Sequence, residues 1–224
     1  MAAEGDPVSA LIGESRWPPA LAIAGYLAIN VALRIWLPAP GIIRAGWLLP
    51  AIEAVLLIVL ITGDPGNREE RRRLRRTAEV LVGLLVAAAL WSTGVLVHDL
   101  ITSSGVSNDA EELLATGGAV WLGNNLAFAL LYWLMDGGGP TARTRLSTPV
   151  DFAFTQQMST ELAPPGWRPV FLDYLHLGFT NATAFSPTDV MPLTLRAKYA
   201  MLTQATIALA LFGLIVARAV NAFT

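Results

Sequence analysis

The chain has 224 residues, of which 54% are hydrophobic and only 14% are charged, and its mean hydropathy is +0.53. Soluble domains carry about 25% charged residues, so this composition predicts a membrane protein. The net charge of −2 argues against a nucleic-acid partner. The chain contains no cysteine, which excludes disulfides, thiolate catalysis and cysteine-bound metals.

Five segments are apolar enough to be membrane-spanning helices, because a bilayer core takes about 20 apolar residues in helical form. They are residues 18–37, 42–62, 78–101, 113–134 and 197–222. The link 38–41 is so short that it joins the first two as an antiparallel hairpin, and Pro50 is expected to kink the second. We therefore predict an all-α, multi-pass integral membrane protein of the cell membrane, either plasma or bacterial inner membrane.

Charge in the links predicts the orientation, since cytoplasmic links are rich in Lys and Arg. Residues 63–76 hold six arginines and are expected to form a cytoplasmic loop, residues 102–112 are acidic and are expected outside, and residues 136–168 are expected inside. The arginines either mark topology alone or also contact anionic lipid headgroups. The candidates for that contact are Arg71, Arg72, Arg73, Arg75 and Arg76.

Residues 173–194 are semi-polar and stand directly before the last apolar helix. A short helix, a polar turn and then a long spanning helix is typical of a re-entrant pore loop. We therefore expect a pore helix and loop before the last span. On this interpretation residues 1–112 form a peripheral bundle of three spans, and residues 113–224 form a pore-like domain.

The segment from Thr183 to Thr194 resembles the filter region of tetrameric potassium channels, which reads Thr-Thr-Val-Gly-Tyr-Gly-Asp followed by a proline and a threonine. Thr183, Asp189, Pro192 and Thr194 match this pattern without gaps. An aromatic at Phe179 falls within the pore helix, and the tail 214–220 is similar to the end of the family's inner helix. The likeness covers about the last 55 residues. It implies a homotetramer with a central pore made by the loop and the last helix.

The five-span layout with an arginine-rich link after the second span also resembles a bacterial membrane-protein family of unknown function. That likeness implies no activity. The potassium-channel pore loop enters from outside, whereas the arginines of this chain place it on the cytoplasmic side. Either the pore is inverted, or one of the five predicted spans is wrong.

The filter of this chain lacks both glycines of the potassium-channel pattern. Those glycines adopt positive φ so that carbonyl groups point at the ion. Here Ser186 and Thr188 occupy the two positions, and Pro187 between them has a fixed φ and no N–H. We therefore predict a degenerate filter that does not select potassium. The candidate pore residues are Thr183, Ala184, Phe185, Ser186, Pro187, Thr188 and Asp189.

Asp189 would form a ring of carboxylates in a four-fold assembly, and such a ring favours cations. The alternative is that Asp189 only caps the turn. Further candidates for lining or gating the pore are His176, Gln204 and Gly213, each with packing as the plainer alternative. The polar residues expected at membrane depth are Glu53, Asn124 and Asn125. These hydrogen-bond between helices or, in the functional alternative, line an ion or proton path.

The residues therefore favour a channel-like homo-oligomer over two alternatives. One is a non-conducting membrane protein that uses the pore-like region for structure or partner binding. The other is a small transporter that works through Glu53. No nucleophile–base pair, metal-ligand cluster or phosphate-binding glycine loop is present in the sequence, so we expect neither an enzyme nor a cofactor.

Overall fold

The structure is a computed structural model that describes residues 15, 17–36, 48–62, 68–102, 110–140, 142–143, 149–159, 161, 163–183 and 189–222. The described part is mostly helical. Its long helices are α1 (Trp17–Trp36), α2 (Leu48–Thr62), α3 (Arg68–Thr102), α4 (Ala110–Met135) and α7 (Leu195–Ala222). The short elements, all between α4 and α7, are η1 (Asp136–Gly138), β1 (Phe152–Phe154), α5 (Thr155–Met158), α6 (Phe171–Thr183) and β2 (Val190–Pro192).

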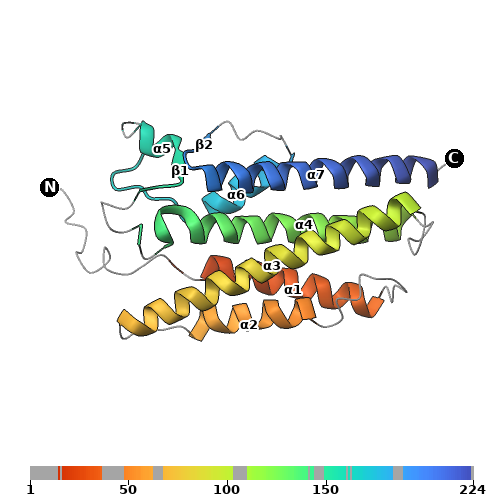
Figure 1. Cartoon of the computed structure of the whole chain (residues 1–224), viewed down its shortest axis with the longest axis horizontal. Helices are drawn as coiled ribbons and strands as arrows, with labels where there is room; N and C mark the ends of the chain where they lie inside the picture. Colours follow the sequence, from red (N-terminus) through yellow and green to blue (C-terminus); the bar gives the residue numbers. More distant parts are fainter. Residues whose placement is uncertain are drawn as a thin grey trace.

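The long helices form an elongated bundle with α4 at its centre (Figure 1). Helices α1 and α2 pack together on one side, and α1 also contacts α4. Helix α3 runs obliquely across one face of the bundle, in contact with α2, α4 and α7, and α6 and α7 cover the other side of α4. More than half of the α4 span is buried (56%), against 22% for α3 and 22% for α7. Because α4 contacts α1, α3, α6 and α7, it organises the core.

Three of the described helices are long and apolar enough to cross a membrane, with spans at Arg73–His98, Leu113–Gly138 and Leu195–Ala217. These spans include most of the predicted third, fourth and fifth segments. The predicted first segment corresponds closely to α1, whereas α2 begins at Leu48 and has only 15 residues. The apolar stretches of α1 and α2 that the structure describes are shorter than a full span.

Two local expectations were wrong. The arginine-rich segment is helical from Arg68 and is not a loop. It belongs to α3, which is one continuous helix of 35 residues. At about 1.5 Å per residue, α3 is longer than a bilayer core of about 30 Å, so its basic end extends the helix past the apolar span. Pro50 lies in the first turn of α2, where a missing N–H disrupts no helical hydrogen bond, so it starts a helix rather than kinking one.

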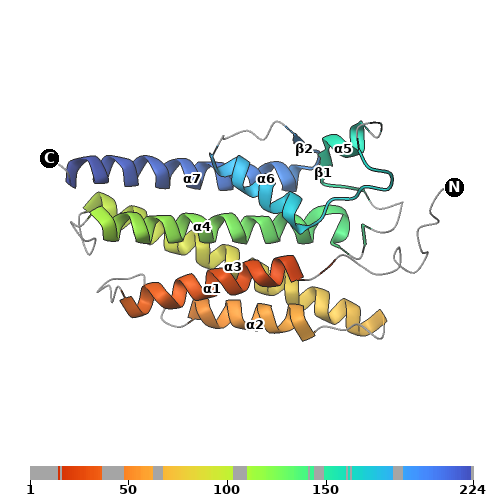
Figure 2. The ribbon, with the colours of Figure 1, turned by 180° about the vertical axis from the view of Figure 1, so that it is seen from behind.

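Among the described residues, the all-α expectation has one exception, a two-stranded antiparallel ribbon. Strands β1 and β2 pair with Phe152 opposite Pro192 and Phe154 opposite Val190. Helices α5 and α6 lie between these strands in the sequence, so the ribbon joins the two ends of one long excursion from the bundle. The ribbon lies at the end of the bundle where α4 ends and α7 begins (Figure 2).

Candidate functional site

Helix α6 follows only half of α4, in the opposite direction. The ring of Phe171 meets Trp133 near the end of α4, with centroids 5.9 Å apart, and the ring of Phe179 meets Trp121 near its middle, at 5.5 Å. At its far end α6 touches the early turns of α7, where Asn181 Nδ2 donates to the Met201 carbonyl at 2.9 Å. Helix α6 thus begins at the ribbon end of the bundle and stops about halfway along it (Figure 2).

Gln204 of α7 holds α6 and α4 together through a buried polar cluster. Its Oε1 accepts hydrogen bonds from Tyr132 Oη at 2.7 Å and Asn181 Nδ2 at 2.9 Å. Its Nε2 donates to the Gly178 carbonyl at 3.0 Å and to Asn125 Oδ1 at 3.4 Å. Gln204 is 1% exposed within a single chain, so its side chain joins three helices and does not lie on a surface that another copy could share.

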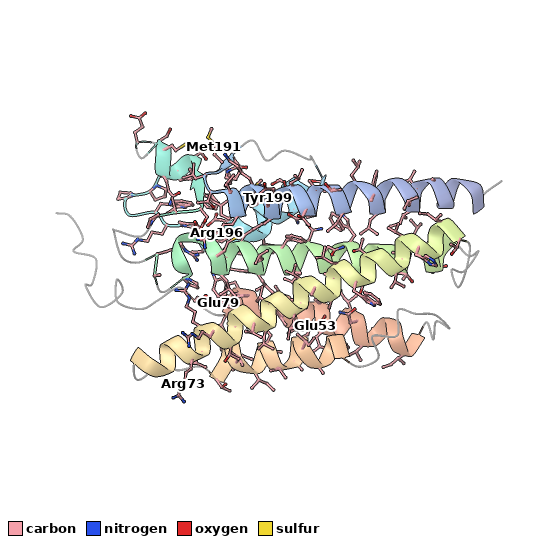
Figure 3. The ribbon with its side chains drawn as sticks, in the orientation of Figure 1. Glu53, Arg73, Glu79, Met191, Arg196 and Tyr199 are labelled. Atoms are coloured by element: carbon pink, nitrogen blue, oxygen red, sulfur yellow. The ribbon has the colours of Figure 1, made fainter. Side chains whose placement is uncertain are left out.

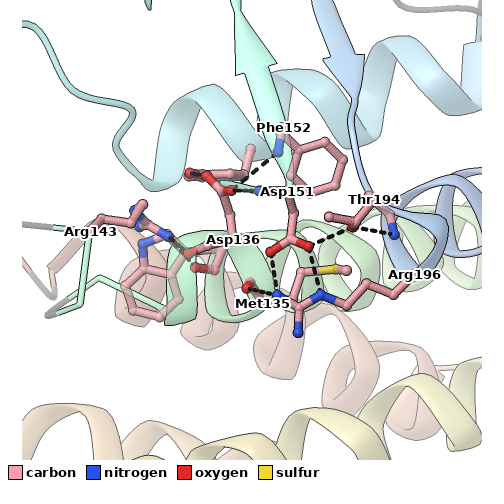
Figure 4. Close-up of polar contacts among 10 residues, drawn as sticks. Met135, Asp136, Arg143, Asp151, Phe152, Thr194 and Arg196 are labelled. Atoms are coloured by element: carbon pink, nitrogen blue, oxygen red, sulfur yellow. Dashed lines mark hydrogen bonds and ion pairs between the residues drawn. The ribbon is translucent and has the colours of Figure 1, made fainter. Parts of the chain in front are cut away.

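A second buried cluster, built on two carboxylates, fixes the base of α6 (Figure 4). The side chain of Asp136, at the end of α4, accepts the backbone N–H groups of Asp151 and Phe152 and the hydroxyl of Tyr174. After Asp136 the chain can turn back toward the ribbon, because Gly137, Gly138 and Gly139 all have positive φ, which glycine adopts without strain. One carboxylate thereby connects α4, β1 and α6.

Asp151, the second carboxylate, connects the ribbon to α7. It accepts hydrogen bonds from Thr194 Oγ1 and from Arg196 Nε, each at 2.6 Å, and it forms a second contact with Arg196 Nη2. Burial raises the pKa of Asp151, but the hydrogen bonds from Arg196 and Thr194 and the Arg196 charge outweigh burial, so the pKa lies below its ordinary value. Figures 3 and 4 show Arg196 at the start of α7, at the ribbon end of the bundle.

The predicted filter lies largely outside the described residues. Ala184, Phe185, Ser186, Pro187 and Thr188 are not described, and only the two flanking residues can be placed. Thr183 is exposed at the end of α6, where its hydroxyl donates to the Phe179 carbonyl at 2.8 Å. Asp189 stands directly before β2, and its carboxylate lies 3.4 Å from His176 Nε2.

The structure distributes the other predicted residues over the bundle. Gly213 is exposed on α7 with no side chain or distant backbone within 4 Å of the position of an added Cβ. Asn124 donates to Thr93 Oγ1 of α3 at 2.8 Å, whereas its own Oδ1 is buried without a hydrogen-bond partner among the described residues. Glu53 belongs to α2, far from α6 in the sequence. It is fully buried and accepts a hydrogen bond from Asn30 of α1 at 2.8 Å. These residues therefore do not form one site.

Among the predicted lipid-contacting arginines, Arg73, Arg75 and Arg76 are exposed on the basic end of α3, and Arg75 pairs with Glu79 at 2.6 Å. The side chains of Arg71 and Arg72 are not described. Figure 3 shows Arg73 toward the same end of the bundle as Arg196. In the described part of the chain, no group of three or more His, Cys, Asp or Glu residues is placed to hold a metal ion.

Sequence reasoning missed the residues that fix α6 in place. Asp136 and Asp151 lie in the link 136–168, which is predicted only to lie inside, and Arg196 stands directly before the predicted last span with no role assigned to it. A carboxylate followed directly by three glycines at the end of an apolar helix is the signal that marks Asp136. Asp151 and Arg196 are 45 residues apart, and no local pattern pairs them.

The site and fold together define a helical protein with apolar helices of membrane-spanning length and a half-length helix tied to the end of its bundle. These apolar helices indicate a membrane protein. Comparison of the chain with protein-family models, with curated proteins and with solved structures gave no match.

Proposed function

We propose that the protein is a channel-like, multi-pass protein of the cell membrane in which identical copies surround a pore. The pore is formed by α6, the residues that follow it and α7, and it passes ions or small solutes without selecting potassium. The spans before residue 113 form the periphery. Four copies are favoured because the potassium-channel filter that residues 183–194 resemble is built from four.

The observation that carries this proposal is the half-length course of α6. The helix begins beside Trp133, ends near the middle of α4 and α7, and the chain is back at the ribbon end by Asp189. A segment that enters a bundle and leaves by the same end has the course of a re-entrant pore loop. Irregular backbone at membrane depth is tolerated only where protein or water surrounds it. A pore between copies supplies such surroundings.

The outward face of α7 supports an assembly of copies within lipid. Leu202, Leu209 and Phe212 are more than half exposed on a single chain. Phe179 of α6 is about half exposed. An apolar surface of this length needs lipid or another copy to cover it. The proposal assigns part of this surface to neighbouring copies and the rest to the bilayer.

The proposal is tested by counting copies in detergent or nanodiscs and by measuring flux into liposomes that contain the purified protein. We expect a four-fold particle and flux without preference for potassium over sodium. Replacing both Ser186 and Thr188 with Gly should not create that preference, because Pro187 still prevents a stack of inward carbonyls. Strong potassium selectivity in the wild type would contradict the degenerate filter.

A non-conducting membrane protein is the second candidate, and the Gln204 cluster favours it. The four side chains of this cluster hold α6 against α4 and α7 within one chain, with no neighbouring copy needed. A monomer without flux would support this candidate. A transporter that works through the buried Glu53 ranks third, and a Glu53→Gln variant with unchanged transport would remove it.

A further inference from the structure

In the described part of the chain, an ionisable contact next to the proposed filter joins His176 to Asp189. The two side chains come from different elements, His176 from α6 and Asp189 from the residue before β2, and they lie on either side of the undescribed residues 184–188. The Nε2 to Oδ2 distance is 3.4 Å, and the two side chains are 60% and 42% exposed. Both groups are therefore in contact with each other and open to an ion in solution.

Both partners are held by the framework around them. Asp189 is fixed by its carbonyl, which accepts the N–H of Thr155 at 3.1 Å, and by the pairing of β2 with β1. His176 lies on α6, which Tyr174 ties to Asp136. The distance between the two groups thus depends on packed elements and not on the filter residues between them.

Three other carboxylates on the surrounding elements have partners of their own. On α6, Asp173 accepts the N–H of Val170. At the base of α6, Asp136 binds Tyr174, and Asp151 binds Arg196 of α7. Lys198 and Tyr199 of α7 are exposed. None of these contacts involves His176 or Asp189.

We propose that Asp189 makes the permeating species a cation and that His176 cancels this preference when it is protonated. This inference rests on the proposed function. With neutral imidazoles, four copies place four carboxylates around the mouth of the pore, and such a ring attracts cations. When the imidazoles are protonated, each His176–Asp189 pair has no net charge, so the ring no longer attracts cations. Histidine is the side chain type that changes charge between about pH 5 and pH 8, so the test spans this range.

The flux test compares cation and anion permeability in liposomes at pH 8 and at pH 5.5, using potassium chloride gradients. In the wild type we expect a cation preference at pH 8 that is lost at pH 5.5. Asp189→Asn should lack the preference at both values, and His176→Gln should keep it at both. The control Glu161→Gln removes an exposed carboxylate between α5 and α6 and should behave as wild type. Equal permeability ratios at the two pH values, or an Asp189→Asn variant that keeps the preference, would overturn the inference.

A second measurement tests the contact itself without any need for flux. Because the chain has no cysteine, His176→Cys and Asp189→Cys can be combined and treated with a crosslinker. The crosslinker is a short bis-maleimide, which adds one thiol at each end and needs no oxidant. Mass spectrometry should find one crosslinker joining both thiols, and each single variant should carry only a one-ended adduct. Failure to crosslink would overturn the pair. If the variant crosslinks but the protein passes no ion, the contact is established and the proposed function is overturned. The charge switch, which rests on that function, is then overturned as well.

Discussion

Gln204 makes four hydrogen bonds from one fully buried amide, and these bonds join α4, α6 and α7. Gln204→Leu should lower the free energy of unfolding by about 2 kcal/mol, because Tyr132, Asn181 and the Gly178 carbonyl lose a partner where no water can replace it. Unfolding by dodecyl sulfate in mixed micelles measures this change.

Thr206→Val is the matched control for Gln204→Leu on the same helix. Thr206 is exposed, and its hydroxyl donates only to Leu202 of its own helix, so the substitution should change stability by less than 0.5 kcal/mol or so, as is usual for surface sites. A single interhelical hydrogen bond in a membrane contributes about 0.6 kcal/mol on average. An effect of Gln204→Leu no larger than that of Thr206→Val would contradict a structural role for the cluster.

Asp151 gives stability a pH dependence with a defined sign. Its pKa is lowered in the folded protein, so the stabilisation is complete above the ordinary aspartate value of about 3.9 and is lost as pH falls through the lower folded value. Asp151→Asn should cost about 2–3 kcal/mol at pH 7, because Arg196 and Thr194 lose a buried carboxylate. The difference in unfolding free energy between wild type and variant should stay constant from pH 7 to pH 5 and shrink only below about pH 4. Shrinkage already at pH 6 would show that Asp151 is not the group responsible.

Close packing of α1 against α4 depends on Gly123. A Cβ added at Gly123 would lie 1.9 Å from the hydroxyl oxygen and 2.4 Å from Cζ of Tyr26 on α1. Gly123→Ala should therefore separate α1 from α4 and cost about 1–3 kcal/mol. Gly118→Ala is the control, because nothing lies within 4 Å of its Cβ position, and alanine there should be neutral or slightly stabilising.

Thermal unfolding in detergent distinguishes the Gly123 and Gly118 variants. In the double variant Tyr26→Ala, Gly123→Ala the two costs should not add, because the first change removes the ring that the second would strike. Fully additive costs would show that the two residues do not meet.

The sequence predicted the elements that repeat a simple pattern and missed those that depend on distant partners. Long apolar runs sufficed for α1, α3, α4 and α7, and the short helix before the last span was expected where α6 lies. Strands β1 and β2 have three residues each, too few to show alternation, and they pair across α5 and α6. Of the candidate site, His176 and Asp189 were singled out separately, but their contact depends on the fold of the intervening chain.

At the scale of the whole molecule, the two ends of the bundle differ in charge. Figure 3 shows Arg73 and Arg196 at the ribbon end, and the exposed Glu111 belongs to the first turns of α4, at the other end. The positive-inside rule predicts that the ribbon end lies in the cytoplasm. The proposed re-entrant segment would then open on the cytoplasmic side.

This orientation is tested by labelling single cysteines with a membrane-impermeant maleimide. Glu111→Cys should react in intact cells, whereas Gln156→Cys of α5 should react only after permeabilisation, since both positions are exposed at opposite ends of the bundle. Ser186→Cys should follow Gln156→Cys. The reverse pattern for the first two variants would invert the protein, and labelling of Ser186→Cys from outside alone would exclude a cytoplasmic loop.

The β1–β2 pairing also sets an order for biogenesis. Helix α6 leaves the ribosome before β2, Thr194 and Arg196, so Asp136 can bind Tyr174 early, whereas the ribbon and the Asp151 contacts form only when these later residues emerge. A nascent chain that stops before residue 190 therefore contains α6 but lacks β2 and Arg196, which attach the chain after α6 to β1 and Asp151. During synthesis the segment has to wait at the translocon, or beside α4, until the last helix emerges, and premature termination in this interval should yield a product for quality-control proteases.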